Sequence, residues 1–499
     1  MNIPKHIFKA YDIRGLIGQE ITPELAQNIG KGFVSLMKRE KPEGVLTIVV
    51  GRDMRESSVE FQKYLTKGIV ESGANIKDIG LVSTPAFCFG VGYTGADAGV
   101  MVSASHNPAE YNGFKLTREN AVPVSGDTGI QDLAEIIEAI PPLTNGGQRG
   151  VHENDSEPSA ILLRKGDVSR IDSVPALSAQ SELKFAGDHP ISKFKIVADS
   201  ANGMGAQYLD EMFKKIDADV VRMYWEFDGS FPNHEADPMK EENLVDLIEK
   251  VKSENADIGI ATDGDGDRIF FVDDKGEILP PAILRGLIAQ IVLRDNPGAT
   301  ICYDIRPGKI TPDMIEEAGG KPVVTRVGHS LIKEKMREVD AVFGGESSGH
   351  FFFKFPVAGS EGSPDLRPPF QGGQQGVSDN HKFAVYEGPV TVVIMLLQEM
   401  TRQGKALSEI VGPFKRYAHS GEINFDVADK EAALEAIKAK YREGDLVEID
   451  GITITYPDFW FNVRPSNTEN KLRFTLEAVD QATMEKMRDE VAGFINSQS

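Results

Sequence analysis

Short apolar runs recur along the chain, and each ends in a polar turn that leads into a helical pattern. The clearest three are VLTIVVGRDMRESS (45–58), KFKIVADSANGMG (193–205) and ATICYDIRPGK (299–309). After the first run, Phe61, Leu65 and Ile69 recur every four residues, which places them on one face of a helix. A buried strand followed by an amphipathic helix is typical of α/β units with largely parallel strand pairing. The pattern therefore predicts similar α/β domains in series.

Two stretches interrupt this pattern. Residues 142–190 are polar and mixed in composition, and we expect the first domain boundary within them. Residues 356–381 are rich in Gly, Pro, Ser and Gln, a composition that is typical of a long loop.

The end of the chain has a different character. EAALEAIKAKY (431–441) predicts a helix, because Ala, Glu and Lys favour helices. VEIDGITITY (447–456) predicts strand pieces around a turn at Asp450-Gly451, and a final helix is expected from Gln481 onward. This part of the chain is predicted to form a smaller α+β domain.

Composition narrows the possible partners. Of 499 residues, 40% are hydrophobic and 26% are charged, values that are typical of a soluble globular protein. Asp and Glu number 76 against 54 Lys and Arg, a formal net charge of -22. Non-specific nucleic-acid binding needs a basic surface, so that class is not expected. An anionic substrate would have to meet a local cluster of Arg and Lys.

The compartment is predicted from the cysteines and from the start of the chain. Cys88 and Cys302 lie far apart and lack metal-type spacing, so no disulfide framework is expected and a reducing cytoplasm is favoured. The opening MNIPKHIFKAYDIRG contains no apolar signal region, and no apolar run reaches membrane-spanning length. We therefore expect no membrane association.

The segment VSASHNPAEYNGFK (102–115) holds the first candidate for chemistry. Ser105 follows an apolar stretch, His106 comes directly after it, and Lys115 lies ten residues further on. A serine hydroxyl is a poor nucleophile unless a base or a prior modification activates it. This segment alone does not indicate what the serine would attack.

The segment ATDGDGDRIFFVDDKG (261–276) is the most specific signal after the serine segment. Asp263, Asp265 and Asp267 alternate with glycines, so that three carboxylates can converge on one divalent cation. Ligands that are all oxygen favour Mg²⁺ or Ca²⁺. An EF-hand would need Gly at Arg268 and Glu at Asp274, so that alternative fails. A solvated acidic turn is the other alternative.

A third motif, AVFGGESSGHFFFKF (341–355), contains the spacing G-x-S-x-G. A hydrolase nucleophile elbow needs a helix after the serine, but the aromatic run here predicts a strand. A loop that presents Glu346 and Ser348 to sugar hydroxyls fits better, because carboxylates and hydroxyls pair with such groups.

Three weaker candidates remain. FNVRPSNTENKLR (461–473) offers donors for a phosphate, namely Arg464, Ser466, Asn467 and Thr468, although an ordinary turn would have the same composition. TRVGHSLIKEKM (325–336) places His329 between a strand end and a helix start, where a structural histidine is the more common case. FKAYDIRG (8–15) carries Tyr11 and Arg14 in a run too polar for a core strand.

Taken together, these motifs resemble the α-D-phosphohexomutases, most closely the bacterial phosphomannomutase/phosphoglucomutase group. SASHNP with YNGFK, DGDGDR and GESSGH occur in the family's order, between FKAYDIRG near the start and RPSNTEN near the end. The resemblance therefore covers nearly the whole chain.

The resemblance implies a fold and an activity. The fold would be three related α/β domains with mixed sheets and a smaller C-terminal α+β domain around a central cleft. The expected domains are 1–170 with the phosphoserine loop, 171–278 with the metal loop, 279–405 with the sugar loop and 406–499 with the phosphate loop. The family's enzymes interconvert hexose 1- and 6-phosphates through a phosphoserine and a bisphosphorylated sugar. Mannose phosphates would be the main substrates and glucose phosphates further ones, and the chain would be a monomer or homodimer.

The resemblance also implies roles for single residues. Ser105 would carry the phosphoryl group, and it would share one Mg²⁺ with Asp263, Asp265 and Asp267. Hexose 1,6-bisphosphate would be the intermediate and activator. The catalytic set would also include Arg14, His106, Lys115, Arg268 and His329. The substrate-binding set would be Tyr11, Arg14, Lys115, Arg306, Lys309, Gly328, His329, Glu346, Ser348, Arg464, Ser466, Asn467 and Thr468.

Rival hypotheses stay open. A phosphoglucomutase would share all these motifs but prefer glucose. A serine-dependent sugar-phosphate phosphatase would share the serine, the metal and the arginines, but it would need a path for water and usually a second metal cluster. A binding protein without catalysis would not need Ser105.

Overall fold

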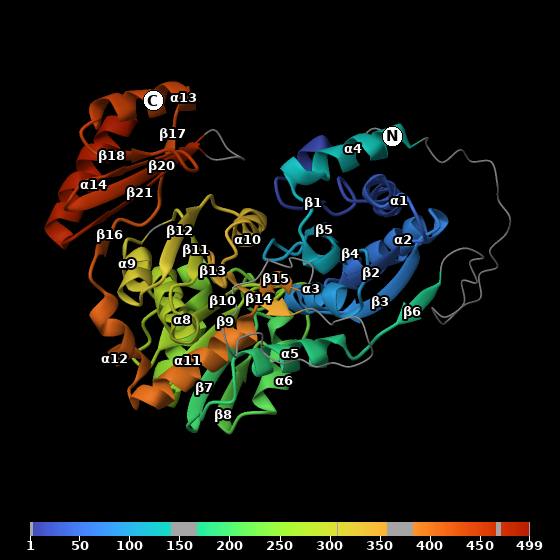
Figure 1. Ribbon diagram of the computed structural model, residues 1–499, viewed down its shortest axis with the longest axis horizontal. Coiled ribbons are helices and arrows are strands. Elements are labelled where there is room, and N and C mark those ends of the chain that lie inside the picture. Colours follow the sequence, from blue (N-terminus) through green and yellow to red (C-terminus); the bar gives the residue numbers. More distant parts are fainter. Residues whose placement is uncertain (1–2, 141–166, 307, 357–382, 466–470, 499) are drawn as a thin grey trace.

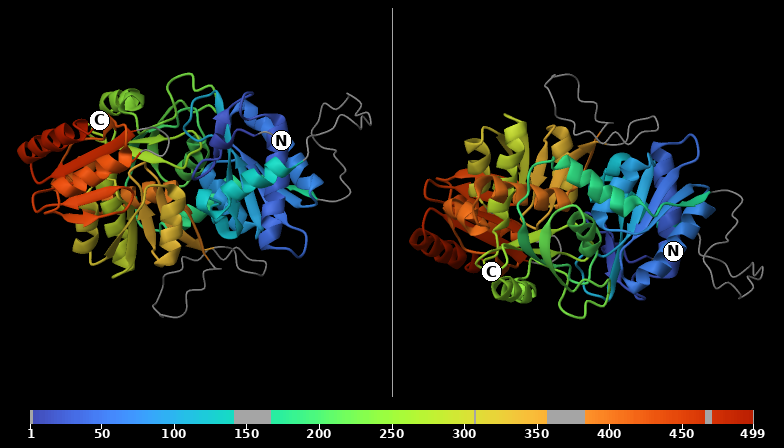
Figure 2. Two further views of the ribbon diagram at one scale, coloured as in Figure 1. Left: turned by 90° about the horizontal axis from the view of Figure 1, so that it is seen from above. Right: turned by 90° about the horizontal axis from the view of Figure 1, so that it is seen from below.

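The computed structural model describes residues 3–140, 167–306, 308–356, 383–465 and 471–498. Four separate β-sheets follow one another along the chain, and helices flank each of them (Figure 1). The first and the last of these units lie at opposite ends of the molecule, with the second and third between them (Figures 1 and 2).

The first sheet has the strand order β1-β5-β4-β2-β3-β6. Its strands are β1 (Ile13–Leu16), β2 (Thr47–Arg52), β3 (Asn75–Leu81), β4 (Ala98–Val102), β5 (Tyr111–Arg118) and β6 (Val168–Arg170). Its helices are α1 (Pro23–Glu40), α2 (Glu56–Glu71), α3 (Thr84–Tyr93) and α4 (Ile130–Ala139). β2 pairs in parallel with β3 and β4, whereas β5 runs antiparallel to β1 and β4.

The alternation of side chains along β2 explains why helices cover both faces of this sheet. Ile48 and Val50 belong to one apolar cluster with α1 and α2, and Val49 belongs to another with α3. Neighbouring side chains of a strand point to opposite faces, so a strand apolar throughout is buried on both sides. The predicted helix after β2 is confirmed, and Leu65 on it is fully buried.

The second sheet has the order β10-β9-β7-β8, and β10 is its antiparallel edge. Its strands are β7 (Phe194–Asp199), β8 (Ala218–Met223), β9 (Ile258–Thr262) and β10 (Ile269–Asp273), with helices α5 (Val174–Phe185), α6 (Gly205–Phe213) and α7 (Val245–Glu254).

The third sheet has the order β12-β11-β13-β14-β15, with β14 and β15 antiparallel. Its strands are β11 (Thr300–Asp304), β12 (Lys321–Thr325), β13 (Phe343–Gly345), β14 (Phe351–Pro356) and β15 (Phe383–Glu387). The helices of this part are α8 (Pro281–Asp295), α9 (Ile310–Glu317), α10 (His329–Glu338), α11 (Pro389–Gln403) and α12 (Leu407–Val411). The long loop predicted at 356–381 lies almost wholly outside the described residues.

The fourth sheet is antiparallel throughout. Its strands are β16 (Ala418–His419), β17 (Ile423–Asp426), β18 (Asp445–Val447), β19 (Ile452–Thr455), β20 (Phe459–Pro465) and β21 (Lys471–Ala478), with helices α13 (Lys430–Lys440) and α14 (Gln481–Asn496). The predicted turn is present between β18 and β19, where Asp450 and Gly451 both have positive φ. The smaller α+β unit is thus confirmed.

The apolar cores divide the molecule unevenly. One cluster runs from Val49 to Val411 and joins side chains of the first three sheets and their helices. A separate cluster, Phe425 to Ile495, fills the fourth unit. None of the helices within the described ranges has the length and apolarity needed to cross a membrane.

Candidate active site

Three of the predicted motifs follow strands in the same way. Ser105 comes after β4, Asp263 after β9 and Glu346 after β13, and each strand is paired in parallel with a neighbour. The carboxyl ends of parallel strands form the usual binding edge of an α/β sheet. The motifs therefore lie at the binding edges of three different sheets.

Ser105 sits in an unusual backbone conformation. Its φ is 52°, in the left-handed region that residues with a side chain seldom adopt. Its N–H donates to Ser103 Oγ at 2.9 Å, and its hydroxyl donates to Asp263 Oδ2 at 3.0 Å. The residue is only 2% exposed. The turn thus directs the hydroxyl of the first domain at the acidic loop of the second.

The acidic loop gathers three buried carboxylates. Asp263, Asp265 and Asp267 each offer an oxygen, and these oxygens lie within 4.8 Å of one another. Burial, reinforced by its two neighbours, raises the pKa of Asp263 well above its usual range. Within the described chain, the Oδ1 atom of Asp265 is buried and has no hydrogen-bond partner. An all-oxygen donor set with a spare buried oxygen fits a hard divalent cation.

Lys115 reaches this loop from β5. Its Nζ lies 2.6 Å from Asp265 Oδ2 and 2.6 Å from Asp267 Oδ2. Burial alone would lower the pKa of Lys115, but the two carboxylates outweigh burial and raise it. Burial likewise acts against ionised Asp267, yet Lys115 and His350 hold the pKa of Asp267 well below its usual range. Lys115 therefore carries a fixed positive charge on the same acidic loop that accepts the Ser105 hydroxyl.

Two arginines and a histidine surround the serine. Arg14 on β1 pairs with Asp12 at 2.7 Å and donates to Asn107 Oδ1 at 2.6 Å. Arg268 lies 3.9 Å from Asp263 Oδ2, and His106 Nδ1 lies 3.2 Å from Ser105 Oγ. Burial, helped by the charges of Arg268 and Arg14, lowers the pKa of His106 well below its usual range. The imidazole of His106 is therefore neutral at pH 7.

The loop after β13 is tied to its surroundings through Glu346. Glu346 Oε1 accepts the N–H of Gly328 at 2.7 Å, and Oε2 accepts the Ser348 hydroxyl at 3.2 Å. Arg306 approaches the same hydroxyl, with its NH2 3.4 Å from Ser348 Oγ. The strand β14 that follows excludes the nucleophile-elbow alternative, which requires a helix there.

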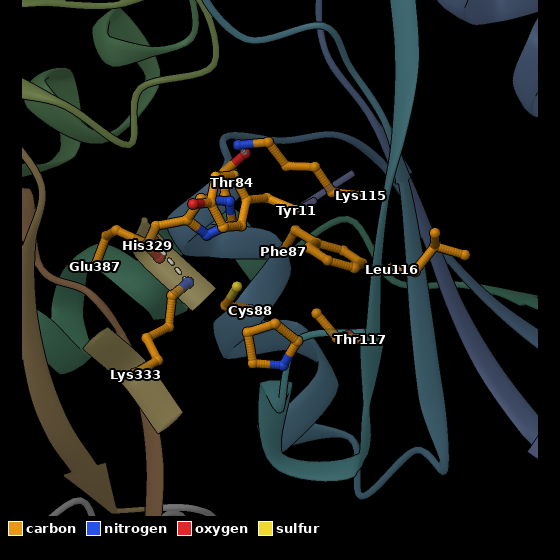
Figure 3. A pocket seen from close by; sticks show the side chains of 11 residues that line it. Tyr11, Thr84, Phe87, Cys88, Lys115, Leu116, Thr117, His329, Lys333 and Glu387 are labelled. Carbon is orange, nitrogen blue, oxygen red and sulfur yellow. Dashed lines mark hydrogen bonds and ion pairs between the residues drawn. The ribbon is translucent and has the colours of Figure 1, made fainter. Parts of the chain in front are cut away.

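His329 begins α10 and borders a small cavity that also reaches Lys115 (Figure 3). Tyr11 lines the same cavity, and its hydroxyl donates to Val327 O at 2.7 Å. Both ring nitrogens of His329 are buried and have no hydrogen-bond partner in the part of the chain that the structure describes. Burial, with the charges of Lys333 and Lys115, lowers the pKa of His329 well below its usual range. A neutral imidazole with a free nitrogen can accept a proton.

Lys309 and Arg464, the other two basic residues predicted to bind substrate, contact groups outside this centre. Lys309 Nζ pairs with Asp313 at 2.7 Å, and the Lys309 N–H donates to Glu477 across the junction of the third and fourth units. Arg464, at the end of β20, pairs with Glu422 at 2.6 Å. Ser466, Asn467 and Thr468 lie outside the described residues, so the phosphate loop stays a prediction.

Three further residues belong to the centre and were missed from the sequence. His350 Nε2 contacts Asp267 at 3.1 Å, and Thr84 Oγ1 donates to Asp265 Oδ2 at 2.6 Å. The buried guanidinium of Arg55 lies behind the serine loop. Only His350 had a local signal, its place directly after the G-x-S-x-G motif.

Comparison with known proteins gives matches along the whole chain. Models of phosphoglucomutase/phosphomannomutase domains match in order: α/β/α domain I at residues 5–143, II at 177–276, III at 281–362 and the C-terminal domain at 422–494. A phosphomannomutase of Methanocaldococcus jannaschii is 36% identical over 490 residues, covering 98% of this chain and 97% of that protein. A phosphomannomutase/phosphoglucomutase of Pseudomonas aeruginosa is 34% identical over 491 residues, covering 97% of this chain and 94% of that protein.

A solved structure agrees with these matches. The crystal structure of a phosphoglucomutase/phosphomannomutase family protein from Burkholderia thailandensis superposes with a TM-score of 0.81 at 30% identity, covering 100% of this chain and 98% of that one.

Proposed function

The chain belongs to the phosphoglucomutase/phosphomannomutase family, and from this premise we propose that it interconverts mannose 1-phosphate and mannose 6-phosphate. The corresponding glucose phosphates are proposed as further substrates, because the relatives include proteins named for both sugars. The enzyme is thus a phosphohexomutase, an isomerase that works by phosphoryl transfer.

One observation carries this proposal. The Ser105 hydroxyl lies 3.0 Å from Asp263 Oδ2, at the edge of a three-carboxylate cluster that also holds the Lys115 ammonium. Phosphoryl transfer depends on positioning and charge stabilisation more than on covalent help. A buried serine beside a cation site and a fixed ammonium offers both.

The proposed transfer begins with phosphorylated Ser105. The bond from phosphorus to Ser105 Oγ breaks as a sugar hydroxyl forms the new bond to phosphorus. The hydroxyl proton passes to a base, and the neutral ring of His329 is our first candidate, with that of His106 as the second. Lys115, the third candidate predicted from the sequence, is already protonated because Asp265 and Asp267 raise its pKa, so it cannot accept this proton. The resulting hexose 1,6-bisphosphate turns around in the site and returns its other phosphate to Ser105 by the reverse steps.

Mg²⁺ is the cation we propose for Asp263, Asp265, Asp267 and the phosphorylated Ser105, one ion per chain. When bound, it neutralises charge on the phosphoryl oxygens. Lys115, Arg14 and Arg268 surround the same group with positive charge. This local concentration of cations supports binding of a dianion despite the net charge of -22.

The rest of the substrate is assigned to the third and fourth units. Glu346 and Ser348 would hold sugar hydroxyls, with Tyr11, Gly328 and His329 lining the wall beside them. The loop from Arg464 to Thr468 would hold the phosphate that does not react. Arg306 and Lys309 would add positive charge to the substrate site from the third unit. Mannose and glucose differ only in the configuration at C2. If the site makes no hydrogen bond to the C2 hydroxyl, exchanging one sugar for the other leaves no buried protein group unpaired, which supports use of both sugars.

The cytoplasm is the proposed compartment of the protein. We propose that the chain is a monomer or a homodimer there. Cys88 and Cys302 are both buried and unbridged, which supports a reducing environment.

The test is an assay that separates isomerisation from hydrolysis. Purified protein with Mg²⁺ is given mannose 1-phosphate or glucose 1-phosphate, and the 6-phosphates and free phosphate are measured. We expect 6-phosphate from both sugars, little free phosphate, and almost no turnover for Ser105→Ala. Release of phosphate as the main product would favour the phosphatase, and full activity of Ser105→Ala would exclude Ser105 as the carrier.

A further inference from the structure

Arg55 is a buried charged side chain outside the predicted site. It lies at the end of the turn that follows β2 and is the residue directly before α2. The side chain is 1% exposed, although arginine is rarely buried so completely unless it is paired. Its Nε lies 3.3 Å from Asp53 Oδ2, so an ion pair balances its charge although Nε makes no hydrogen bond among the described residues. The remaining donors all point at one short segment of backbone.

That segment is the serine loop, residues 105–111. Two guanidinium nitrogens of Arg55 reach four of its carbonyl oxygens: NH2 donates to Ser105 O at 2.9 Å and Asn107 O at 2.5 Å, and NH1 donates to Pro108 O at 2.8 Å and Tyr111 O at 3.1 Å. The planar fork of a guanidinium can hold several acceptors at fixed angles, which the ammonium of lysine cannot do. Arg55 thus fixes the backbone on both sides of the His106-Asn107-Pro108 turn.

A loop of the second domain packs against the same guanidinium. The ring of Phe231 lies 5.0 Å from Arg55 Cζ, a cation–π distance. Gly229 of the same loop lies so close that a Cβ there would be 2.6 Å from Arg55 Cα. Arg55 therefore lies between the serine loop of the first domain and the 229–231 loop of the second.

This arrangement accounts for how Ser105 keeps its conformation. With a φ of 52° the serine is in a backbone region that surrounding structure must enforce. The carbonyl that Arg55 binds belongs to Ser105 itself, and the hydroxyl of the same residue points at Asp263. Movement of that carbonyl would redirect the hydroxyl away from the carboxylates.

We propose that Arg55, packed against the ring of Phe231, is a positioning residue that holds the Ser105 loop in the conformation that phosphoryl transfer requires. The proposal rests on the proposed mutase function. Arg55 touches neither substrate nor metal in this scheme, so its loss should affect turnover and leave sugar binding nearly unchanged.

The main variant is Arg55→Lys, which keeps the charge and loses the fork. We expect kcat to fall about 100-fold, as for a misplacement of about 1 Å, while KM for mannose 1-phosphate stays within about three-fold. Arg337→Lys is the matched control, since Arg337 also donates to two carbonyls, Lys333 O and Val385 O, but lies on α10 away from the serine loop. Its kcat should stay within about three-fold of the parent.

Phe231→Ala provides a second variant, which decides the matter if Arg55→Lys does not fold. Phe231→Ala leaves Arg55 and its four carbonyl acceptors in place and removes only the aromatic ring that packs against the guanidinium. We expect kcat to fall about ten-fold with KM unchanged. The proposal is overturned if the folded variants keep the parent's kcat, or if kcat and KM change in equal proportion.

Hydrogen exchange separates this proposal from the proposed function. The amides of residues 103–112 should exchange faster in Arg55→Lys than in the parent, and Arg337→Lys should not differ from the parent there. This readout needs no turnover, so it remains decisive if the parent shows no mutase activity. Unchanged exchange in this segment would refute the positioning role.

Discussion

His350 Nε2 lies 3.1 Å from Asp267 Oδ1, and this contact joins the sugar loop of the third domain to the metal loop of the second. On its other side, His350 Nδ1 lies 3.2 Å from Glu346 Oε2. Burial alone would lower the pKa of His350, but Asp267 and Glu346 raise it to about 9. His350 is therefore a cation at neutral pH, held between two buried carboxylates.

Replacement of His350 by alanine should affect both stability and turnover. Removal of one partner from a buried ion pair leaves an uncompensated charge and costs about 3 kcal/mol or more. Because the loops that carry Asp267 and Glu346 would also separate, we expect kcat to fall about 100-fold. Thermal unfolding and the mutase assay measure the two effects. His234→Ala is the matched control, because His234 also contacts an aspartate at 3.1 Å, Asp199, and lies outside the proposed machinery. Equal activity in the two variants would contradict this role of His350.

Removal of the metal should abolish turnover without unfolding the chain. Treatment with a chelator is expected to stop mutase activity, and added Mg²⁺ should restore it. Asp265→Asn should raise the Mg²⁺ concentration for half-maximal activity about ten-fold or more, because Asp265 offers a buried oxygen that has no partner among the described residues. Circular dichroism before and after chelation reports the fold. Activity that survives chelation would show that the acidic loop holds no essential cation.

Gly264 should tolerate no side chain. A Cβ at this position would lie 2.5 Å from the carbonyl oxygen of Ser105, closer than real Cβ contacts allow. Gly264→Ala is therefore expected to push the serine loop from the metal loop and to lower kcat about 100-fold. Gly493→Ala is the control, since a Cβ in that part of α14 meets nothing within 4 Å. That substitution should leave kcat unchanged and raise stability by up to about 1 kcal/mol.

The pH dependence of stability should show the effect of Glu182 on α5. Glu182 is 1% exposed, and its Oε2 accepts the N–H of Thr391 at the start of α11. Burial, reinforced by the charge of Glu387, raises the pKa of Glu182 from 4.5 to about 8. Between these two values the unfolded chain is ionised and the folded chain is protonated, so unfolding releases a proton. Stability therefore falls as pH rises from 4.5 to 8, by about 1.4 kcal/mol per pH unit at most.

Glu182→Gln should remove this dependence. The difference in Tm, variant minus parent, is expected to increase from pH 5 to pH 8, because only the parent loses stability over this range. Glu485→Gln, at an exposed position of α14, should give a constant difference over the same range. A constant difference for Glu182→Gln as well would contradict the raised pKa.

Local pattern was enough to predict the motifs and the strand–helix units. Ser105, Asp263 and Glu346 each follow a strand, as expected from the apolar runs before them. The pattern favoured largely parallel sheets, yet β5, β10 and β14 are antiparallel. A fully buried strand is apolar on both faces whichever way its neighbour runs, so periodicity carries no information on direction.

Contacts between distant segments could not be predicted in this way. Lys115 was expected beside the phosphoserine, but its pairing with Asp267 spans 152 positions. Arg55 has no sequence signal, because its four acceptors are backbone carbonyls, which every residue possesses. Thr84 had no motif at all. Such residues are identified only once the fold brings their partners to them.

The unequal division of the apolar cores determines which domains should unfold together. One apolar core, with members from Val49 to Val411, joins the first three domains, although the first domain also has a separate cluster from Ile3 to Ile137. Because this shared core would be broken if any one of the three unfolded, we expect them to melt as a single cooperative unit. The fourth domain has its own core from Phe425 to Ile495 and can open without disturbing the other one. Heating should therefore give two calorimetric transitions, and the fourth domain should be able to unfold while Ser105, Asp263 and Glu346, which lie in the first three domains, stay together.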